Sequence, residues 1–306
     1  GFLCGKEAQV FFGNAVNVAV FAVVFFAVNV IFREYCRKKR CSSLSQLSVN
    51  VFTKFAWIFD LALTTCCFVC IVTMLAGAEQ CLGSVLPVSS VIPLYGLVTS
   101  VIAAAVLSKG MKALKIANVI SITLAVALIV TLLCINTEKS GFSQIKVPPY
   151  KPAAYALFSV TMSFGVTTQL GAESDLKRNL ITSATAAAVL SALMLLIIYL
   201  SDFSLNLPAI ENIKNPYVLA LSVVTITLSA VTGIVANAMP IVEQMRDFIP
   251  DHSLCCILTF GSALAFSLFG FDFAVNFGYV LVGVIGAIVI IAAVARQFCE
   301  RRRKSA

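Results

Sequence analysis

The stretch Ser163-Phe164-Gly165-Val166-Thr167-Thr168-Gln169-Leu170-Gly171-Ala172-Glu173 closes an apolar run that begins near Ala153. Two glycines and several hydrogen-bonding side chains stand in a segment otherwise suited to a membrane helix. Serine and threonine compete for backbone hydrogen bonds and glycine favours helix poorly, so this pattern predicts a helix interrupted inside the membrane. The alternative is a helix that ends at Gly171 in a C-cap, with its hydroxyls bonded to its own carbonyls.

The composition places this stretch in a polytopic membrane protein. Hydrophobic residues make up 60% of the 306 residues, charged residues 12%, and the mean hydropathy is +0.98. Soluble domains carry about 25% charged residues. Runs of about 20 apolar residues predict an all-α bundle in one transmembrane domain, 1–306, and strand-like alternation is absent. The expected spans are Asn14–Ile31, Val51–Gly77, Val91–Leu107, Ala117–Cys134, Ala153–Leu170, Ile181–Leu200, Pro216–Met239, Ser253–Phe269 and Phe273–Val294.

A second interruption is predicted at the start of the chain, in Gly1-Phe2-Leu3-Cys4-Gly5-Lys6-Glu7-Ala8-Gln9-Val10-Phe11-Phe12. Two glycines and an adjacent Lys6–Glu7 pair directly precede a long apolar run. We expect this segment to be the second half of a discontinuous first helix whose first half is missing from this chain. Transporters place their substrate site at such breaks. Glu7 and Lys6 either line that site or lie at the membrane interface.

Basic residues gather in alternate loops. The positive-inside rule assigns these loops and the C-terminus to the cytoplasm. The net charge of +8 then follows from topology and from anionic membrane lipids, and no nucleic-acid partner is expected. The assigned residues are Arg33, Arg37, Lys38, Lys39, Arg40, Lys54, Lys109, Lys112, Lys115, Lys177, Arg178, Arg246, Arg296, Arg301, Arg302, Arg303 and Lys304.

Polar residues within the spans supply the other candidate sites. Burying the charge of Asp60 in a membrane costs free energy unless the carboxylate faces water or a partner. Asp60 is therefore a candidate ion carrier, or it lies nearer the interface. Asn14 and Asn17, one turn apart, line a cavity or bond across helices, and Asn276 and Tyr279 carry the same two interpretations.

A small polar stripe recurs every four residues in the span after Pro216. Thr225, Ser229, Gly233 and Asn237 form this stripe. It is either a helix–helix interface or a row of hydroxyls that coordinates an ion. The motifs of ATP-driven transport and of metalloproteases are missing, and the chain has one histidine. We expect no enzyme activity, no catalytic residue, no metal site and no cofactor other than a coupling Na⁺ or H⁺.

The segment Gly1–Phe12 resembles the G-F-A-[ST]-G-Q-E-[IL]-x-x-F-F segment of YkvI-like bacterial membrane proteins. Met74-Leu75-Ala76-Gly77-Ala78 is similar to their M-x-A-G-A stretch, and Phe269-Gly270-Phe271 with Gly278-Tyr279 and Gly283 to their F-G-F…Y-P-x-x-G-Y ending. The chain departs from that family in having Lys6 where Gln is usual and in lacking the proline near Tyr279.

The YkvI-like family resembles a distant branch of the amino acid–polyamine–organocation transporters, which have the LeuT fold. The resemblance implies inverted five-helix repeats with helices one and six discontinuous: residues 1–134 as the rest of the first repeat, 151–296 as the second, and 297–306 as a basic cytoplasmic tail. Together with the polar residues described above, the resemblance places the substrate at Gly1, Gly5, Lys6, Glu7, Asn14, Asn17, Ser163, Gly165, Thr167 and Thr168, and the ion at Thr225, Ser229 and Asp60. Lys6 can instead replace a coupling cation.

These observations predict a secondary transporter of an amino acid or amine in a bacterial plasma membrane, coupled to Na⁺ or H⁺. Its expected partners are membrane lipids and a small solute, and a homo-oligomer is compatible with the sequence. The alternative is a membrane sensor, receptor or scaffold that keeps a transporter fold without transport.

Overall fold

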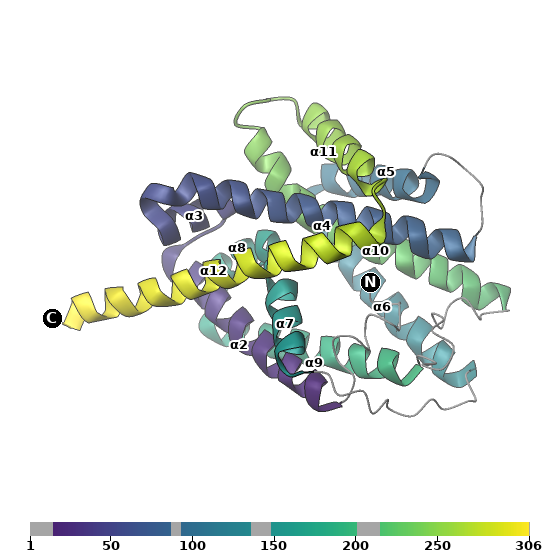
Figure 1. The fold of residues 1–306 in the computed structure, drawn as a ribbon, viewed down its shortest axis with the longest axis horizontal. Coiled ribbons are helices and arrows are strands. Elements are labelled where there is room, and N and C mark those ends of the chain that lie inside the picture. The colour runs from purple at the N-terminus through teal and green to yellow at the C-terminus, as the bar shows by residue number, and fades with distance from the viewer. Residues whose placement is uncertain (1–14, 87–92, 136–147, 201–214, 306) are drawn as a thin grey trace.

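The computed structural model describes residues 15–86, 93–135, 148–200 and 215–305, which form helices and short connections without a strand. Each expected span has a helical counterpart there (Figure 1), and the span Ala153–Leu170 has two. The helices are α2 (Ala15–Lys39), α3 (Leu44–Phe52), α4 (Ala56–Val85), α5 (Leu94–Ser108), α6 (Gly110–Ile135), α7 (Tyr150–Met162), α8 (Phe164–Glu173), α9 (Leu176–Leu200), α10 (Pro216–Met245), α11 (His252–Ser267) and α12 (Phe271–Ser305), with the 3₁₀ turn η1 (Thr53–Phe55) between α3 and α4.

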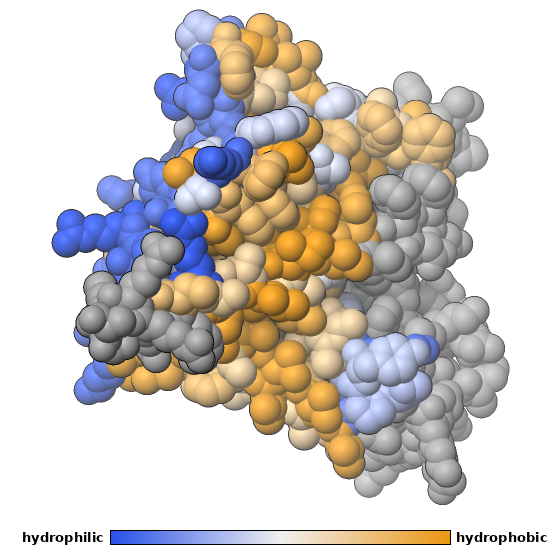
Figure 2. All heavy atoms as spheres, turned by 60° about the vertical axis from the view of Figure 1, so that its left-hand side comes forward, coloured by the Kyte–Doolittle hydropathy of each residue, from blue (hydrophilic) through white to orange (hydrophobic). Residues whose placement is uncertain are grey.

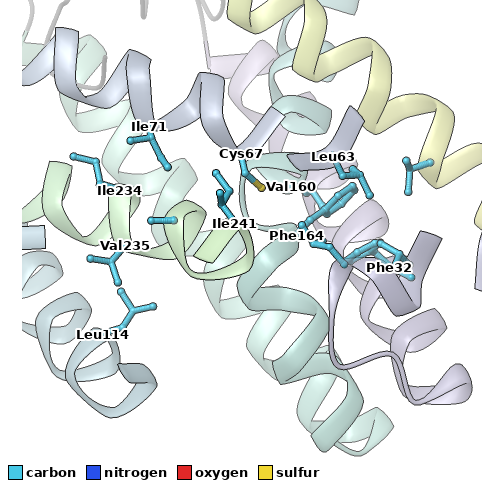
Figure 3. Packing of buried hydrophobic residues seen from close by; sticks show 14 of the residues in the cluster. Phe32, Leu63, Cys67, Ile71, Leu114, Val160, Phe164, Ile234, Val235 and Ile241 are labelled. Atoms are coloured by element: carbon cyan, nitrogen blue, oxygen red, sulfur yellow. The ribbon is translucent and has the colours of Figure 1, made fainter. Parts of the chain in front are cut away.

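Helices α4 and α10 form the centre of the bundle (Figure 1). Each has 30 residues and is therefore roughly 45 Å long. Buried apolar side chains join them, among them Cys67 and Ile71 of α4 and Ile234 and Ile241 of α10 (Figure 3). Helices α5 and α11 pack on one side of this pair, whereas α2, α7, α8 and α9 pack against one another on the other side.

The surface matches a membrane environment. Figure 2 shows a broad hydrophobic band, with hydrophilic residues gathered at one side of it. Among the described residues, five helical segments are long and apolar enough to cross a membrane, and three further apolar helices are shorter. We call the hydrophilic side, where α2, α8 and α10 end and α4 and α9 begin, the basic end; Arg37, Lys38 and Lys39 in the last turn of α2 lie there.

The structure corrects the expected loop between the first two complete spans, because this segment contains helix α3. Ser43 caps the helix by accepting a hydrogen bond from the Gln46 backbone N–H (3.2 Å). Leu44, Leu47 and Val51 lie on its buried face, at the spacing of an amphipathic helix. Arg296 Nη1 donates to the Val51 carbonyl (2.9 Å) and so ties α12 to the end of α3.

Several helices run further than the sequence predicts, α4 and α12 among them. Helix α4 continues to Val85, beyond the expected end of its span at Gly77. Helix α12 continues to Ser305, so the basic residues 297–305 continue this helix.

Candidate functional site

The helix interruption predicted between Ser163 and Gly171 lies at its first residue, Ser163. Helix α7 ends at Met162, α8 begins at Phe164, and Ser163 between them has φ −97° and ψ 1°. Its backbone N–H and its hydroxyl both donate to the Val160 carbonyl, at 3.0 and 2.7 Å, which closes α7 with a tight turn. The sequence therefore predicted the interruption, and the serine forms it.

The two glycines of this stretch lie inside α8 and allow close helix packing. A Cβ at Gly165 would lie 2.9 Å from Pro240 Cγ and 3.1 Å from the Ala236 carbonyl oxygen, both on α10. A Cβ at Gly171 would lie 3.0 Å from the carbonyl oxygen of Arg33 on α2. Helix α8 is thus held between the backbones of α10 and α2, and replacing either glycine would push these helices apart.

Helix α7 also packs closely, in its case against α12. A Cβ at Gly286 of α12 would overlap Thr161 Oγ1 and would lie 2.7 Å from Thr161 Cβ. The Thr161 hydroxyl donates to the Leu157 carbonyl of its own helix (2.8 Å), which fixes its orientation. Both halves of the interrupted helix pack on α2, and in addition α7 packs on α12 whereas α8 packs on α10.

The hydroxyls of Thr167 and Thr168 close the first turn of α8. Thr167 Oγ1 donates to the Ser163 carbonyl (2.7 Å), and Thr168 Oγ1 donates to the Phe164 carbonyl (2.9 Å). Both side chains are buried. Because their protons are used within α8, only the lone pairs of these oxygens are available to a bound solute.

Asn17 is the expected site residue that the structure places away from the break. Phe32 of α2 stacks on Phe164, with ring centroids 4.1 Å apart, and so lies level with the interruption (Figure 3). Asn17 is buried near the other end of α2, roughly 22 Å from Phe32 along the helix. The predicted residues Gly1, Gly5, Lys6, Glu7 and Asn14 lie outside the described residues, as do the side chains of Asn276 and Tyr279.

A different asparagine of α2 lies close to the level of the interruption. Asn29 precedes Phe32 by almost one turn, is 4% exposed, and its Oδ1 has no hydrogen-bond partner among the described residues. Asn29 is not among the site residues expected from the sequence. The available signal was a single amide in the apolar run Val28-Asn29-Val30-Ile31-Phe32, on the same helix face as Phe25 and Phe32.

Helix α10 adds further acceptors beside the break. Pro240 has no N–H to donate to the Ala236 carbonyl, the same oxygen that lies against Gly165. The next residue, Asn237, is 3% exposed and donates Nδ2 to the Gly233 carbonyl (2.9 Å), whereas its Oδ1 has no partner in the described structure. The surroundings of Ser163 are therefore rich in acceptor oxygens, which suits an ammonium group or a cation.

The expected ion-binding hydroxyls of α10 lie at a distance from this point. Thr225 is buried and donates to the Leu221 carbonyl (2.7 Å), roughly 16 Å along the helix from Ala236. Ser229 is exposed, and its Oγ lies 2.9 Å from Ser121 Oγ on α6. These contacts belong to helix packing, and an ion-binding role for Thr225 and Ser229 stays a prediction.

Asp60 lies in the second turn of α4, at the basic end, in a network that joins three helices. Ser45 of α3 donates to its Oδ2 (3.0 Å) and Gln244 of α10 to its Oδ1 (3.0 Å). Thr64, one turn on, donates to Gln244 Oε1. The carboxylate thus has hydrogen-bond partners at the basic end, and both interpretations of Asp60 stay predictions. In the described part of the chain no cluster of three His, Cys, Asp or Glu side chains could hold a metal ion.

Comparison with solved structures identifies the fold. A crystal structure of MhsT in complex with L-phenylalanine aligns with a TM-score of 0.67 over 95% of this chain and 83% of that chain, at 12% sequence identity. No protein-family model and no curated protein matches the sequence. The predicted all-α polytopic membrane fold, of the LeuT type, is therefore confirmed, whereas membership of the YkvI-like family stays a prediction.

Proposed function

We propose that this chain is a secondary transporter that moves an amino acid or a related amine across a cell membrane by alternating access. The observation that carries the proposal is the interruption of α7–α8 at Ser163, in a bundle with the fold of MhsT, a protein crystallised with L-phenylalanine. Interrupted helices leave polar backbone groups at membrane depth, and these need a polar partner.

The groups around the interruption suit a zwitterion. The first turn of α8 carries the partial positive charge of a helix N-terminus, which attracts a carboxylate. The acceptors Asn29 Oδ1 and the Ala236 carbonyl approach the same level from α2 and α10, and they suit an ammonium group. The proposed solute is therefore a small molecule with both a positive and a negative charge. It crosses the membrane as one set of helices rocks against another.

The proposed coupling ion is Na⁺ or H⁺. Thr225 and Ser229 are the proposed Na⁺ ligands and Asp60 is the proposed proton carrier. The proposed location is the plasma membrane, with the basic end in the cytoplasm. Labelling Cys299, which is exposed on α12, with a membrane-impermeant maleimide tests this orientation. Reaction from the cytoplasmic side alone is expected.

Uptake by proteoliposomes tests the proposal. The purified full chain is reconstituted, and entry of labelled amino acids and amines is followed under imposed Na⁺ or proton gradients. Saturable uptake of at least one zwitterion is expected, with a large loss in Asn29→Leu and a small one in Asn17→Leu, the matched amide away from the break. Absence of uptake under every gradient would contradict transport. Ligand-induced stabilisation without uptake would instead favour a membrane sensor.

A further inference from the structure

Arg33 is a buried cation near the basic end of α2. The residue is 6% exposed, and its Nε donates to Asn179 Oδ1 of α9 (3.1 Å). A guanidinium has five N–H donors, and that of Arg33 makes a single hydrogen bond to the described residues. Because a buried charge without a counter-charge costs several kcal/mol, the remaining donors call for an anionic partner.

The neighbouring acidic side chains are engaged elsewhere. Glu34 forms ion pairs with Arg37 (2.7 Å) and Lys38 (3.3 Å). Asp175 accepts the Arg178 backbone N–H (2.8 Å) at the start of α9. Arg178 itself is near enough to repel Arg33 electrostatically. The carboxyl end of α8, which touches Arg33 through Gly171, contributes only a partial negative charge.

Asn179 provides an independent sign of a missing ligand. The residue is 0% exposed, and its Nδ2 has no hydrogen-bond partner in the described structure. Its Oδ1 is held by Arg33, so Nδ2 lies beside the guanidinium. Unbonded donors of Arg33 on α2 and Asn179 on α9 therefore lie side by side, an arrangement that suits an oxyanion.

We propose that Arg33 and Asn179 bind the phosphate group of an anionic membrane lipid. The planar guanidinium suits two phosphate oxygens, and Asn179 Nδ2 suits a third contact. The adjacent surface of α9 is apolar, because Leu176, Leu180 and Ile181 are exposed there, and it suits an acyl chain better than a free anion. This site is formed by α2 and α9 near the basic end, uses none of the groups proposed to bind the solute, and does not depend on the transport proposal.

Thermal unfolding of the full chain in lipid nanodiscs tests the site. The midpoint is measured in phosphatidylcholine alone, with phosphatidylglycerol added, and with inorganic phosphate added. Two variants that each lower the net charge by one are compared: Asn179→Asp, which supplies a carboxylate beside Arg33, and Arg37→Gln, which removes a cation already paired with Glu34. Arg33→Gln removes the guanidinium itself.

Phosphatidylglycerol is expected to raise the wild-type midpoint by several degrees, by mass action on the folded state. Arg37→Gln should keep this shift. Asn179→Asp should unfold at a higher temperature in phosphatidylcholine alone and should lose more than about half of the shift, because the site then holds its own anion. An unchanged shift in Asn179→Asp, or none in the wild type, would overturn the site. A full shift with inorganic phosphate alone would overturn the lipid assignment.

Discussion

The contact between α4 and α10 and the contact between α2 and α9 differ in how they treat polar groups. The first is joined mainly by buried apolar side chains, and at its basic end Thr64, Asp60 and Gln244 are bonded to one another. In the second, Nδ2 of Asn179 is buried without a hydrogen-bond partner among the described residues. The hydroxyls of Ser183 and Ser191, also on α9, are likewise buried without a hydrogen-bond partner among the described residues.

The hydrogen bonding of these buried polar atoms affects the free energy of folding. A buried polar atom without a partner costs about 1–3 kcal/mol, whereas a bonded one contributes modestly. Among the described side chains of α4 and α10, Asn237 Oδ1 alone is such an atom, so their contact is nearly complete and suits a rigid scaffold. The α2 and α9 surfaces gain free energy when a ligand, water or another arrangement of the helices supplies their missing partners. Four predictions test this comparison.

The largest effect is expected from truncation in the α4–α10 contact. Ile71→Ala removes a wholly buried side chain at its centre (Figure 3) and should lower the free energy of unfolding by about 2–5 kcal/mol. The measurement is unfolding of the detergent-solubilised protein in increasing dodecyl sulfate. Ile122→Ala on α6, where the side chain is 50% exposed, is the matched control and should change little. Equal losses would contradict a central scaffold at α4–α10.

A smaller loss is expected at the contact between α8 and α10. Gly165→Ala places a Cβ against the ring of Pro240 and should cost about 1–3 kcal/mol through overpacking. Gly261→Ala on α11 has open space around its Cβ and should be neutral or stabilising by up to about 1 kcal/mol. The same unfolding assay compares them. A stabilising Gly165→Ala would show that α8 is free to move away from α10.

Loss of one hydrogen bond in the scaffold should have an effect of about 1–2 kcal/mol. Thr64→Val keeps the shape of the side chain but leaves Gln244 Oε1 without its donor. The unfolding free energy is measured alone and together with Gln244→Leu. Because the two residues share one bond, the double variant should lose less than the sum of the single losses. Additive losses would mean that this bond contributes nothing to stability.

The smallest effect, with the opposite sign, is expected in α9. Ser183→Ala removes a buried hydroxyl that has no hydrogen-bond partner in the described structure, and it should be neutral or stabilising by up to about 1 kcal/mol. The thermal midpoint in detergent is sufficient to measure it. A marked destabilisation would show that this hydroxyl already has a partner, such as water, and that the contrast between the two contacts is weaker than proposed.

Sequence reasoning predicted the helices well because apolar runs of membrane length are a direct physical requirement of the bilayer. It also predicted the interruption near Ser163 from local chemistry. It missed α3, because a nine-residue amphipathic helix resembles a polar loop. It treated Arg33 as one of several interfacial cations, because its partner Asn179 lies 146 residues away. It grouped Asn17 with Ser163, although the level of a residue along a bundle depends on how helices pack.

The close contact between Gly286 of α12 and Thr161 of α7 limits how α7 can move. With the Thr161 hydroxyl seated where a Cβ would stand, α7 cannot slide along α12 or roll upon it without first separating from it. Helices α7 and α12 therefore behave as one rigid unit. Any change in the angle between α7 and α8 would therefore have to come from the torsion angles of Ser163, the one residue between the two helices.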